Sequence, residues 1–128
     1  MKNMFVYRNY NPYGKIVGDC VVRAISTILD EPWDDIYEDL TDEGFRMKDM
    51  PSANSVWGAY LQHRGFVRYA LPDACPACYT VKNFCEDHPV GKFILATGTH
   101  VVAVIDGDYI DTWDSGDQVP LAYWERRR

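Results

Sequence analysis

The feature that most constrains this chain is a hairpin-like segment over residues 98–114. At its centre is Asp106-Gly107, a dipeptide that readily adopts the positive φ angles of a two-residue turn, and β-branched or aromatic residues flank it on both sides. The pattern predicts two antiparallel strands with Ile105 opposite Asp108. The register of these strands then decides which side chains can meet on one face of the hairpin.

The predicted register brings a histidine and a carboxylate together. Counting outward from the turn places His100 opposite Trp113, with Asp111 diagonal to His100 on the same face and Asp114 on the other face. Diagonal Cβ atoms lie about 7–8 Å apart, so an imidazole and a carboxylate that lean together can form a hydrogen bond. The register therefore favours Asp111 over Asp114 as the partner of His100. A three-residue loop would shift the count by one residue.

A candidate nucleophile lies far upstream of the hairpin. The segment Gly-Asp-Cys-Val-Val-Arg-Ala-Ile places Cys20 at the start of an apolar run with helical spacing, and Asp19 is available as its N-cap. A thiol at a helix N-terminus meets the positive end of the helix dipole, and a nearby imidazolium lowers its pKa further. A histidine held by a carboxylate can act as the base for such a thiol. The purely structural alternatives are that Cys20 is a buried inert thiol and that His100 is a strand histidine bonded to a neighbour.

The composition is typical of a folded protein. With 128 residues, 47% hydrophobic and 25% charged, we expect one domain over residues 1–128. The formal net charge of -6 argues against general binding to nucleic acid or to membrane surfaces, and the basic residues 126–128 are expected to form a solvated tail. No apolar run is long enough to span a bilayer and no signal-peptide core is present, so we expect a cytoplasmic location.

Helices are expected mainly in the first half of the chain and strands in the second. Four helices are expected: one from residue 19 or 20 to 29, one that begins after Pro32, one that follows Ser52 as its N-cap and stops at Gly65, and one at 80–87. Besides the hairpin, strands are expected at 4–8, 66–71, 92–97 and 118–124. This order predicts an α+β fold with a meandering antiparallel sheet. Eight carboxylates between residues 30 and 43 fit no EF-hand loop and are expected to form a solvated helix face. His63 is expected to cap the end of its helix.

The order of these features resembles the papain-like cysteine peptidase superfamily, in which a cysteine opens a buried helix and a histidine and an aspartate follow on adjacent strands. The segments 100–105 and 109–111 look most like the bacteriocin-leader peptidase branch. The segments Asn11-Pro12, 18–24 and 111–116 also resemble short proteins carried by phages and prophages. The resemblance implies N-terminal helices, with the nucleophile at the start of a central helix, packed on a C-terminal antiparallel sheet.

The same resemblance implies a cysteine-dependent hydrolase, a peptidase or an amidase-type acyl transferase, that needs no cofactor. Cys20 would be the nucleophile, His100 the general base and later the general acid, and Asp111 the residue that orients His100. Hydrolysis, deamidation and transamidation would use the same residues. The substrate would be a protein, a peptide or a small amide, and for a phage protein it could be a host protein in the host cytoplasm.

One family feature is missing from the chain. Such peptidases usually place a glutamine a few residues before the cysteine to stabilise the oxyanion, whereas the sixth residue before Cys20 is Gly14. We expect Asn11 or Asn9 to replace it, together with the backbone N–H of Cys20. Trp113 is expected to contact the substrate.

A second group of residues has the spacing of a metal site. Cys75-x-x-Cys78 followed by Cys85-x-x-His88 supplies four ligands of the kinds that Zn²⁺ binds tetrahedrally. Such a zinc would stabilise the fold rather than catalyse, because four protein ligands leave no open position. Free thiols or a redox-reversible Cys75–Cys78 pair are the alternatives, and a framework of disulfides is not expected in a cytoplasmic chain.

The alternative function is a catalytically silent papain-like binding module that sequesters a host protein or a small ligand. The aromatic residues near the predicted cleft could line such a binding site, and the zinc site would then be a structural element of the module.

Overall fold

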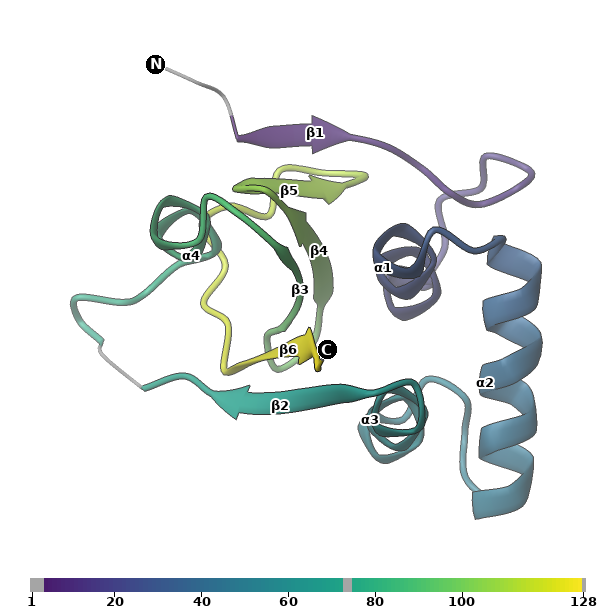
Figure 1. Cartoon of the computed structure of the whole chain (residues 1–128). Coiled ribbons are helices and arrows are strands. Elements are labelled where there is room, and N and C mark those ends of the chain that lie inside the picture. Colours follow the sequence, from purple (N-terminus) through teal and green to yellow (C-terminus); the bar gives the residue numbers. More distant parts are fainter. Residues whose placement is uncertain (1–3, 73–74, 128) are drawn as a thin grey trace.

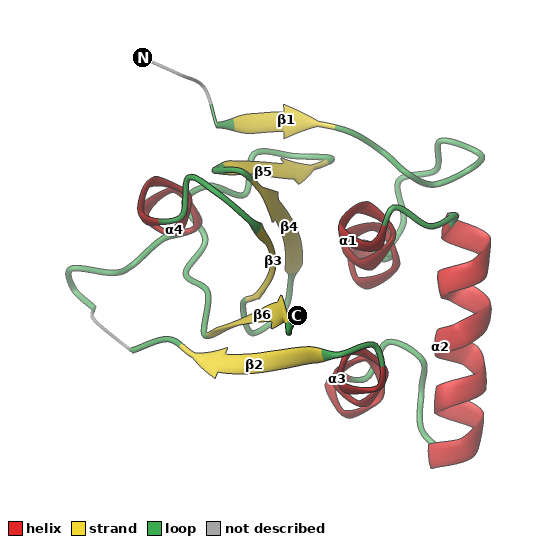
Figure 2. Cartoon of the chain, in the orientation of Figure 1, coloured by secondary structure: helices red, strands yellow, loops and turns green. Residues whose placement is uncertain are grey.

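The computed structural model describes residues 4–72 and 75–127, which form four helices and six strands (Figures 1 and 2). In chain order these are β1 (Phe5–Tyr7), α1 (Cys20–Leu29), α2 (Trp33–Met47), α3 (Asn54–His63), β2 (Phe66–Ala70), α4 (Val81–Asp87), β3 (Lys92–Ala96), β4 (Val101–Ile105), β5 (Asp108–Asp111) and β6 (Ala122–Arg126). The predicted α+β class is therefore confirmed. No helix within these described residues is long and apolar enough to cross a membrane.

The six strands form one mixed sheet in the order β1-β5-β4-β3-β6-β2. Strands β3, β4 and β5 make the expected antiparallel meander. The expectation of an antiparallel sheet is wrong at one edge, where β1 pairs in parallel with β5. At the other edge the pairing is antiparallel as expected, but the strands do not follow in meander order: β6 pairs with β3, and β2 pairs with β6. The two edge strands, β1 and β2, thus both precede in the sequence the strands β3 to β6 that they flank.

Helices cover both faces of this sheet (Figure 1). Helices α1 and α3 pack on one face with α2 outside them, and α4 lies on the other face. Successive residues of β4 alternate between the two cores, because Ala103 packs with Ile25 of α1 whereas Val104 packs with Phe84 of α4. Burial on both faces explains why β4 is an almost continuous apolar run.

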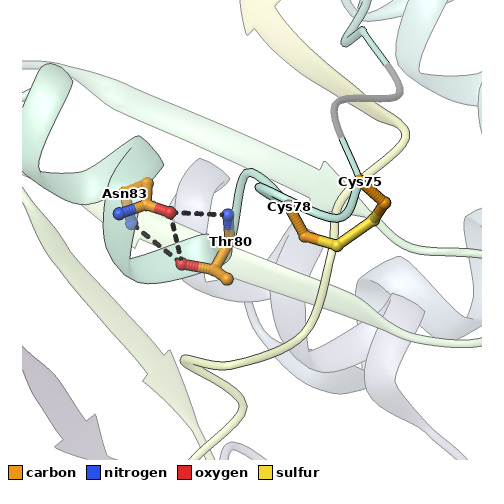
Figure 3. Close-up of a disulfide and its surroundings, with 4 residues drawn as sticks. All are labelled: Cys75, Cys78, Thr80 and Asn83. Carbon is orange, nitrogen blue, oxygen red and sulfur yellow. Dashed lines mark hydrogen bonds between the residues drawn. A yellow bond between two sulfur atoms is a disulfide. The ribbon is translucent and has the colours of Figure 1, made fainter.

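Most helix ends follow the local sequence, and the start of α3 is an exception. Helix α3 begins two residues after the predicted N-cap Ser52, and Ala53 at the N-cap position makes no side-chain cap bond. Gly65, with a φ of 88°, follows the end of α3 as expected. Thr80 caps α4 in a reciprocal capping box with Asn83 (Figure 3). The last strand lies later than expected, at residues 122–126 rather than 118–124.

The acidic helix face is not solvated throughout. Glu43 on α2 is buried, and its Oε1 atom lies 2.7 Å from Nδ1 of His63 on α3. The expectation for Glu43 is therefore wrong, because Glu43 faces the neighbouring helix. His63 lies in the last turn of α3 as expected, and its ring also binds Glu43 across the interface. The packing of α3 against α2 brings the two residues together, which the spacing within either helix does not reveal.

Candidate active site

The turn that was predicted from the sequence positions the site. Asp106 and Gly107 have φ angles of 49° and 80°, as a two-residue hairpin turn requires. Ile105 pairs with Asp108 in the register expected for this turn. The predicted hairpin and its two-residue loop are confirmed, so the strand residues further out also take their expected positions.

His100 and Asp111 meet across the open end of this hairpin. Nε2 of His100 lies 2.6 Å from Oδ2 of Asp111, and the imidazole ring lies 4.8 Å from the ring of Trp113 between centroids. Asp114 points elsewhere, because its carboxylate accepts a hydrogen bond from the hydroxyl of Tyr109. Among the two aspartates compared at the sequence level, the structure thus places Asp111 against His100.

Cys20 approaches the same imidazole from helix α1, which packs against β4. It is the first residue of that helix and is partly exposed. Its side chain is hydrogen-bonded to His100, and the backbone N–H of Val101 also donates to its sulfur. Because Asp111 occupies Nε2 of His100, Nδ1 is the ring atom left for the thiol. The structure therefore brings Cys20, His100 and Asp111 into one continuous chain of contacts.

The electrostatics of this group favour charge separation. Burial raises the pKa of the Cys20 thiol, but the hydrogen bonds from His100 and Val101 and the positive charges of His100 and Arg23 outweigh it, so the net pKa is lowered. Burial lowers the pKa of His100, but the bonds and charges of Asp111 and Cys20 raise it to about 9. A thiolate beside an imidazolium is the arrangement that these opposite shifts support.

A buried arginine completes the site, and the sequence analysis did not identify it. Arg23 is only 8% exposed, and it lies one turn after Cys20 in α1. Its Nη1 donates to Oδ1 of Asp111 at 3.1 Å, and its Nε donates to Oδ1 of Asp19 at 2.8 Å. The i, i+4 spacing of Asp19 and Arg23 was a visible signal, but their contact with Asp111 depends on how α1 packs on the sheet.

Asp19 does not cap the helix in the predicted way. It occupies the N-cap position, but its side chain makes no capping bond. Its Oδ2 instead accepts hydrogen bonds from Nδ2 of Asn11 at 3.2 Å and from Nε1 of Trp33 at 3.0 Å. Because Arg23 binds the other oxygen, the negative charge of Asp19 is balanced and does not act unopposed on the neighbouring thiol.

The carboxylate of Asp111 is held by four hydrogen bonds. Besides His100 and Arg23, the hydroxyl of Ser115 donates to Oδ2 at 2.7 Å and the backbone N–H of Thr112 donates to Oδ1 at 2.8 Å. Burial raises the pKa of Asp111, but the bonds to His100 and Ser115 outweigh it and keep the pKa below its ordinary value. Asp111 is therefore ionised and fixed in orientation. Ser115 is a second contributor that the sequence analysis missed.

The two asparagines proposed as oxyanion donors lie in the loop before α1. Nδ2 of Asn9 donates to the backbone oxygen of Lys15 at 3.0 Å, so this amide holds the loop together. Nδ2 of Asn11 lies beside Asp19, the residue that precedes Cys20. Asn11 is thus nearer to the nucleophile through its contacts, and its role as a donor stays a prediction. Gly14, with a φ of 66°, has no atom within 4 Å of where a Cβ would lie.

Comparison of the chain with family models, with curated proteins and with solved structures found no match. The function must therefore be argued from the contacts of the site itself.

The four predicted zinc ligands do not gather in one place. Cys75 and Cys78 form a disulfide (Figure 3), so of the alternatives weighed for these two cysteines the structure has the Cys75–Cys78 pair rather than zinc ligands or free thiols. Cys85 is buried, and burial together with the nearby acidic side chains raises its pKa to about 12. Nδ1 of His88 lies 2.8 Å from the backbone oxygen of Phe84. Across residues 4–72 and 75–127, no three histidine, cysteine or acidic side chains are grouped as metal ligands.

Proposed function

We propose that the protein is a cysteine-dependent hydrolase, a papain-like peptidase or amidase that transfers an acyl group through Cys20. The observation that supports this proposal is the continuous hydrogen-bonded chain from the Cys20 thiol through His100 to the buried carboxylate of Asp111. Cys20 begins helix α1, His100 directly precedes strand β4, and Asp111 ends strand β5. A nucleophile, its base and the group that orients the base are the three parts that such catalysis requires.

The chemistry follows from the positions of these groups. The Cys20 thiolate attacks the carbonyl carbon of an amide, and the electron pair of the C=O bond moves to the oxygen. The backbone N–H of Cys20, at the start of α1, stabilises that oxyanion together with an amide such as that of Asn11. The imidazolium of His100 gives its proton to the leaving nitrogen as the C–N bond breaks, which leaves a thioester.

Hydrolysis of the thioester completes the cycle. His100, now neutral, takes a proton from water while the water oxygen attacks the acyl carbon, and Cys20 departs as a thiolate. Asp111 holds the His100 ring in one orientation and stabilises its charged form through both steps. The ring of Trp113 beside His100 is 44% exposed, so it is available to contact the substrate.

A catalytically silent binding module is the second candidate, and one observation favours it. The amides of Asn9 and Asn11, the expected oxyanion donors, already make hydrogen bonds to Lys15 and Asp19. Loss of one oxyanion donor costs about 10²–10³ in rate. A reactive Cys20 without turnover would therefore support this candidate.

The first test is alkylation by limiting iodoacetamide at several pH values without reductant, followed by peptide mapping. Cys85 provides an internal control, because it is buried and its pKa is raised to about 12. We expect Cys20 to be labelled first, and His100→Ala to slow it most at acid pH. At pH 6.5 an ordinary thiol is about 1% ionised, so the lowered pKa of Cys20 gives the wild type more thiolate at this pH than the His100→Ala variant has.

His63→Gln is the matched histidine control, because His63 lies at the end of α3 and binds Glu43, and it is not part of the Cys20, His100 and Asp111 group. Labelling of Cys20 no faster than that of Cys85, or no slower after His100→Ala, would contradict the hydrolase proposal. Turnover is then measured by mapping new peptide termini, and by assaying released ammonia, in a peptide library incubated with the wild type or with Cys20→Ala. Rapid labelling with no new termini and no released ammonia would leave the binding module as the function.

A further inference from the structure

The disulfide between Cys75 and Cys78 lies at the surface and is not part of the candidate active site. Cys75 is exposed and Cys78 is half-buried, and the two residues between them, Pro76 and Ala77, are exposed as well. A thiolate opens a disulfide by attacking one of its two sulfur atoms, so access from outside decides whether the exchange can occur. The exposed Cys75 is the end of the bond at which a thiol from solution can attack.

This disulfide closes too small a loop to contribute much to the stability of the fold. Only two residues separate the cysteines. The entropy that a disulfide removes from the unfolded chain grows with the length of the loop it closes, so a bond between residues i and i+3 stabilises the folded state least. Exposed disulfides are also the ones that exchange with thiols most readily. The position and the spacing of the pair therefore favour redox chemistry over a structural role.

The disulfide lies on the chain that leads into helix α4 (Figure 3). Cys78 is two residues before Thr80, the N-cap of α4, which forms the capping box with Asn83. The ring that the disulfide closes restricts the backbone of residues 75–78, and thereby the directions from which the chain can enter α4. Reduction removes this restraint immediately before the first turn of the helix.

The first turn of α4 holds the loop that supports the candidate active site. The backbone N–H groups of Val81 and Lys82 donate to backbone oxygens of the segment 115–118, at 2.9 Å and 3.0 Å. In the same segment the hydroxyl of Ser115 donates to Oδ2 of Asp111 at 2.7 Å. A path of covalent and hydrogen bonds thus runs from the disulfide through the start of α4 to this buried carboxylate.

We propose that Cys75 and Cys78 form a redox site that thiols such as glutathione open and close, and that the open form loosens the start of α4 and with it Ser115. A thiolate attacks the sulfur of Cys75, the S–S bond breaks, and Cys78 leaves as a thiolate that takes up a proton. A second thiol then attacks the reductant's sulfur in the mixed disulfide, which frees Cys75 as a thiol and releases the reductant as its own disulfide. Two electrons and two protons pass to the pair, and oxidised glutathione reverses both steps. The redox site does not depend on the proposed hydrolase activity.

Equilibration with glutathione tests the redox site. The folded protein is held in buffers with different ratios of reduced to oxidised glutathione, quenched in acid, and labelled with a maleimide after unfolding, and peptide mapping gives the reduced fraction of the pair. We expect this fraction to rise from nearly zero to nearly one across the series, and to fall again when oxidised glutathione is added. Cys85, a free thiol in the structure, should be labelled throughout. A pair that stays oxidised in the most reducing buffer, or reduced in the most oxidising one, would overturn the redox site.

Single variants test which sulfur is attacked. In oxidised glutathione, Cys78→Ser should form a mixed disulfide at Cys75 severalfold faster than Cys75→Ser forms one at Cys78, because Cys75 is the more exposed of the two. Equal rates, or the reverse order, would contradict attack at Cys75.

Hydrogen exchange of backbone amides, followed by NMR, tests the link to Ser115. The amides of Val81 and Lys82 report on the path, as does that of Gln118, which donates to the backbone oxygen of Ser115. We expect these three amides to exchange severalfold faster in the reduced protein than in the oxidised protein, because their hydrogen bonds open more often. The amides of β4, in the middle of the sheet, should exchange at the same rate in both forms.

Two variants separate the effect of the pair from that of the reductant. Cys75→Ser combined with Cys78→Ser should exchange like the reduced protein even in oxidising buffer. Cys20→Ala is the control: it keeps the pair, so its exchange should respond to reduction as that of the wild type does. Unchanged exchange at the three amides on reduction would overturn the link to Ser115. Neither measurement uses turnover or labelling of Cys20, so failure of the redox proposal and failure of the hydrolase proposal are distinguishable.

Discussion

Removal of the Cys20 thiol should change how the stability of the protein depends on pH. In the wild type the folded Cys20–His100 pair holds one proton near neutral pH, whichever of the two groups carries it. The unfolded chain also holds about one, on the thiol. In Cys20→Ala the folded state keeps a proton on His100, because Asp111 still binds the imidazole. The unfolded imidazole loses most of its protons above its ordinary pKa of 6.5.

The magnitude follows from proton counting. At pH 7.5 the unfolded His100 holds about 0.1 proton and the folded one holds more, because the hydrogen bond and charge of Asp111 still raise its pKa, so the free energy of unfolding of Cys20→Ala falls by up to about 1 kcal/mol per pH unit. The contribution of a raised pKa is complete below 6.5 and is lost as the pH rises through the folded value, which is about 9 with Cys20 present. The His100 side chain is 11% exposed, so solvent screens this effect little. The wild-type pair should contribute a slope near zero.

Urea unfolding at pH 6.5, 7.0, 7.5 and 8.0 measures this difference. Subtracting the wild-type curve cancels the other titrating groups, and we expect the stability of Cys20→Ala relative to wild type to decline across the series. Cys85→Ala is the control: the pKa of its thiol is raised to about 12 in the folded state, and an unfolded thiol with a pKa of about 8.5 is still mostly protonated up to pH 7.5, so its removal should shift stability with little change of slope below pH 8. Parallel curves for wild type and Cys20→Ala would refute the view that Asp111 holds His100 in its charged form.

Two further substitutions test the framework around the site. Arg23→Met leaves the buried carboxylates of Asp19 and Asp111 without their shared cation. We therefore expect urea unfolding to show that the free energy of unfolding falls by about 3 kcal/mol, and we expect alkylation of Cys20 to become slower. A fall below about 1 kcal/mol would contradict the importance of these ion pairs. Gly107→Ala should destabilise the hairpin by roughly 1 kcal/mol or more, because its φ is 80° and a Cβ would lie 3.3 Å from a backbone oxygen of Cys85. Thermal unfolding against Gly98→Ala, which has no atom within 4 Å of a Cβ, measures it, and equal stabilities would contradict the turn geometry.

The hairpin was predictable because its information is local. The dipeptide Asp106-Gly107 selects a two-residue turn, and the side-chain period of two then sets every position along both strands. The contact between His100 and Asp111 follows from that register alone. Helix α1 was predictable for a similar reason, because apolar residues at helical spacing begin at Cys20.

The rest of the sheet could not be predicted from such local signals. The pairing of β1 with β5 joins Phe5 to Tyr109, and that of β2 with β6 joins Phe66 to Arg126. These contacts connect distant segments, and no turn residue specifies them. The disulfide between Cys75 and Cys78 was uncertain for a different reason, because a Cys-x-x-Cys spacing is compatible with zinc ligands, free thiols or a disulfide.

Arg23 shows why the site required the three-dimensional structure. Helix α1 supplies both Cys20 and Arg23, and Arg23 binds the same carboxylate that orients His100. One helix packed on β4 therefore positions the Cys20 thiol and anchors the carboxylate of Asp111 at the same time. The charges of Asp19, Arg23, Asp111 and protonated His100 cancel, so the thiolate adds the only net charge to the cluster, next to the positive end of the helix dipole. Arg23 is therefore part of the charge balance at the thiol as well as of the geometry around Asp111.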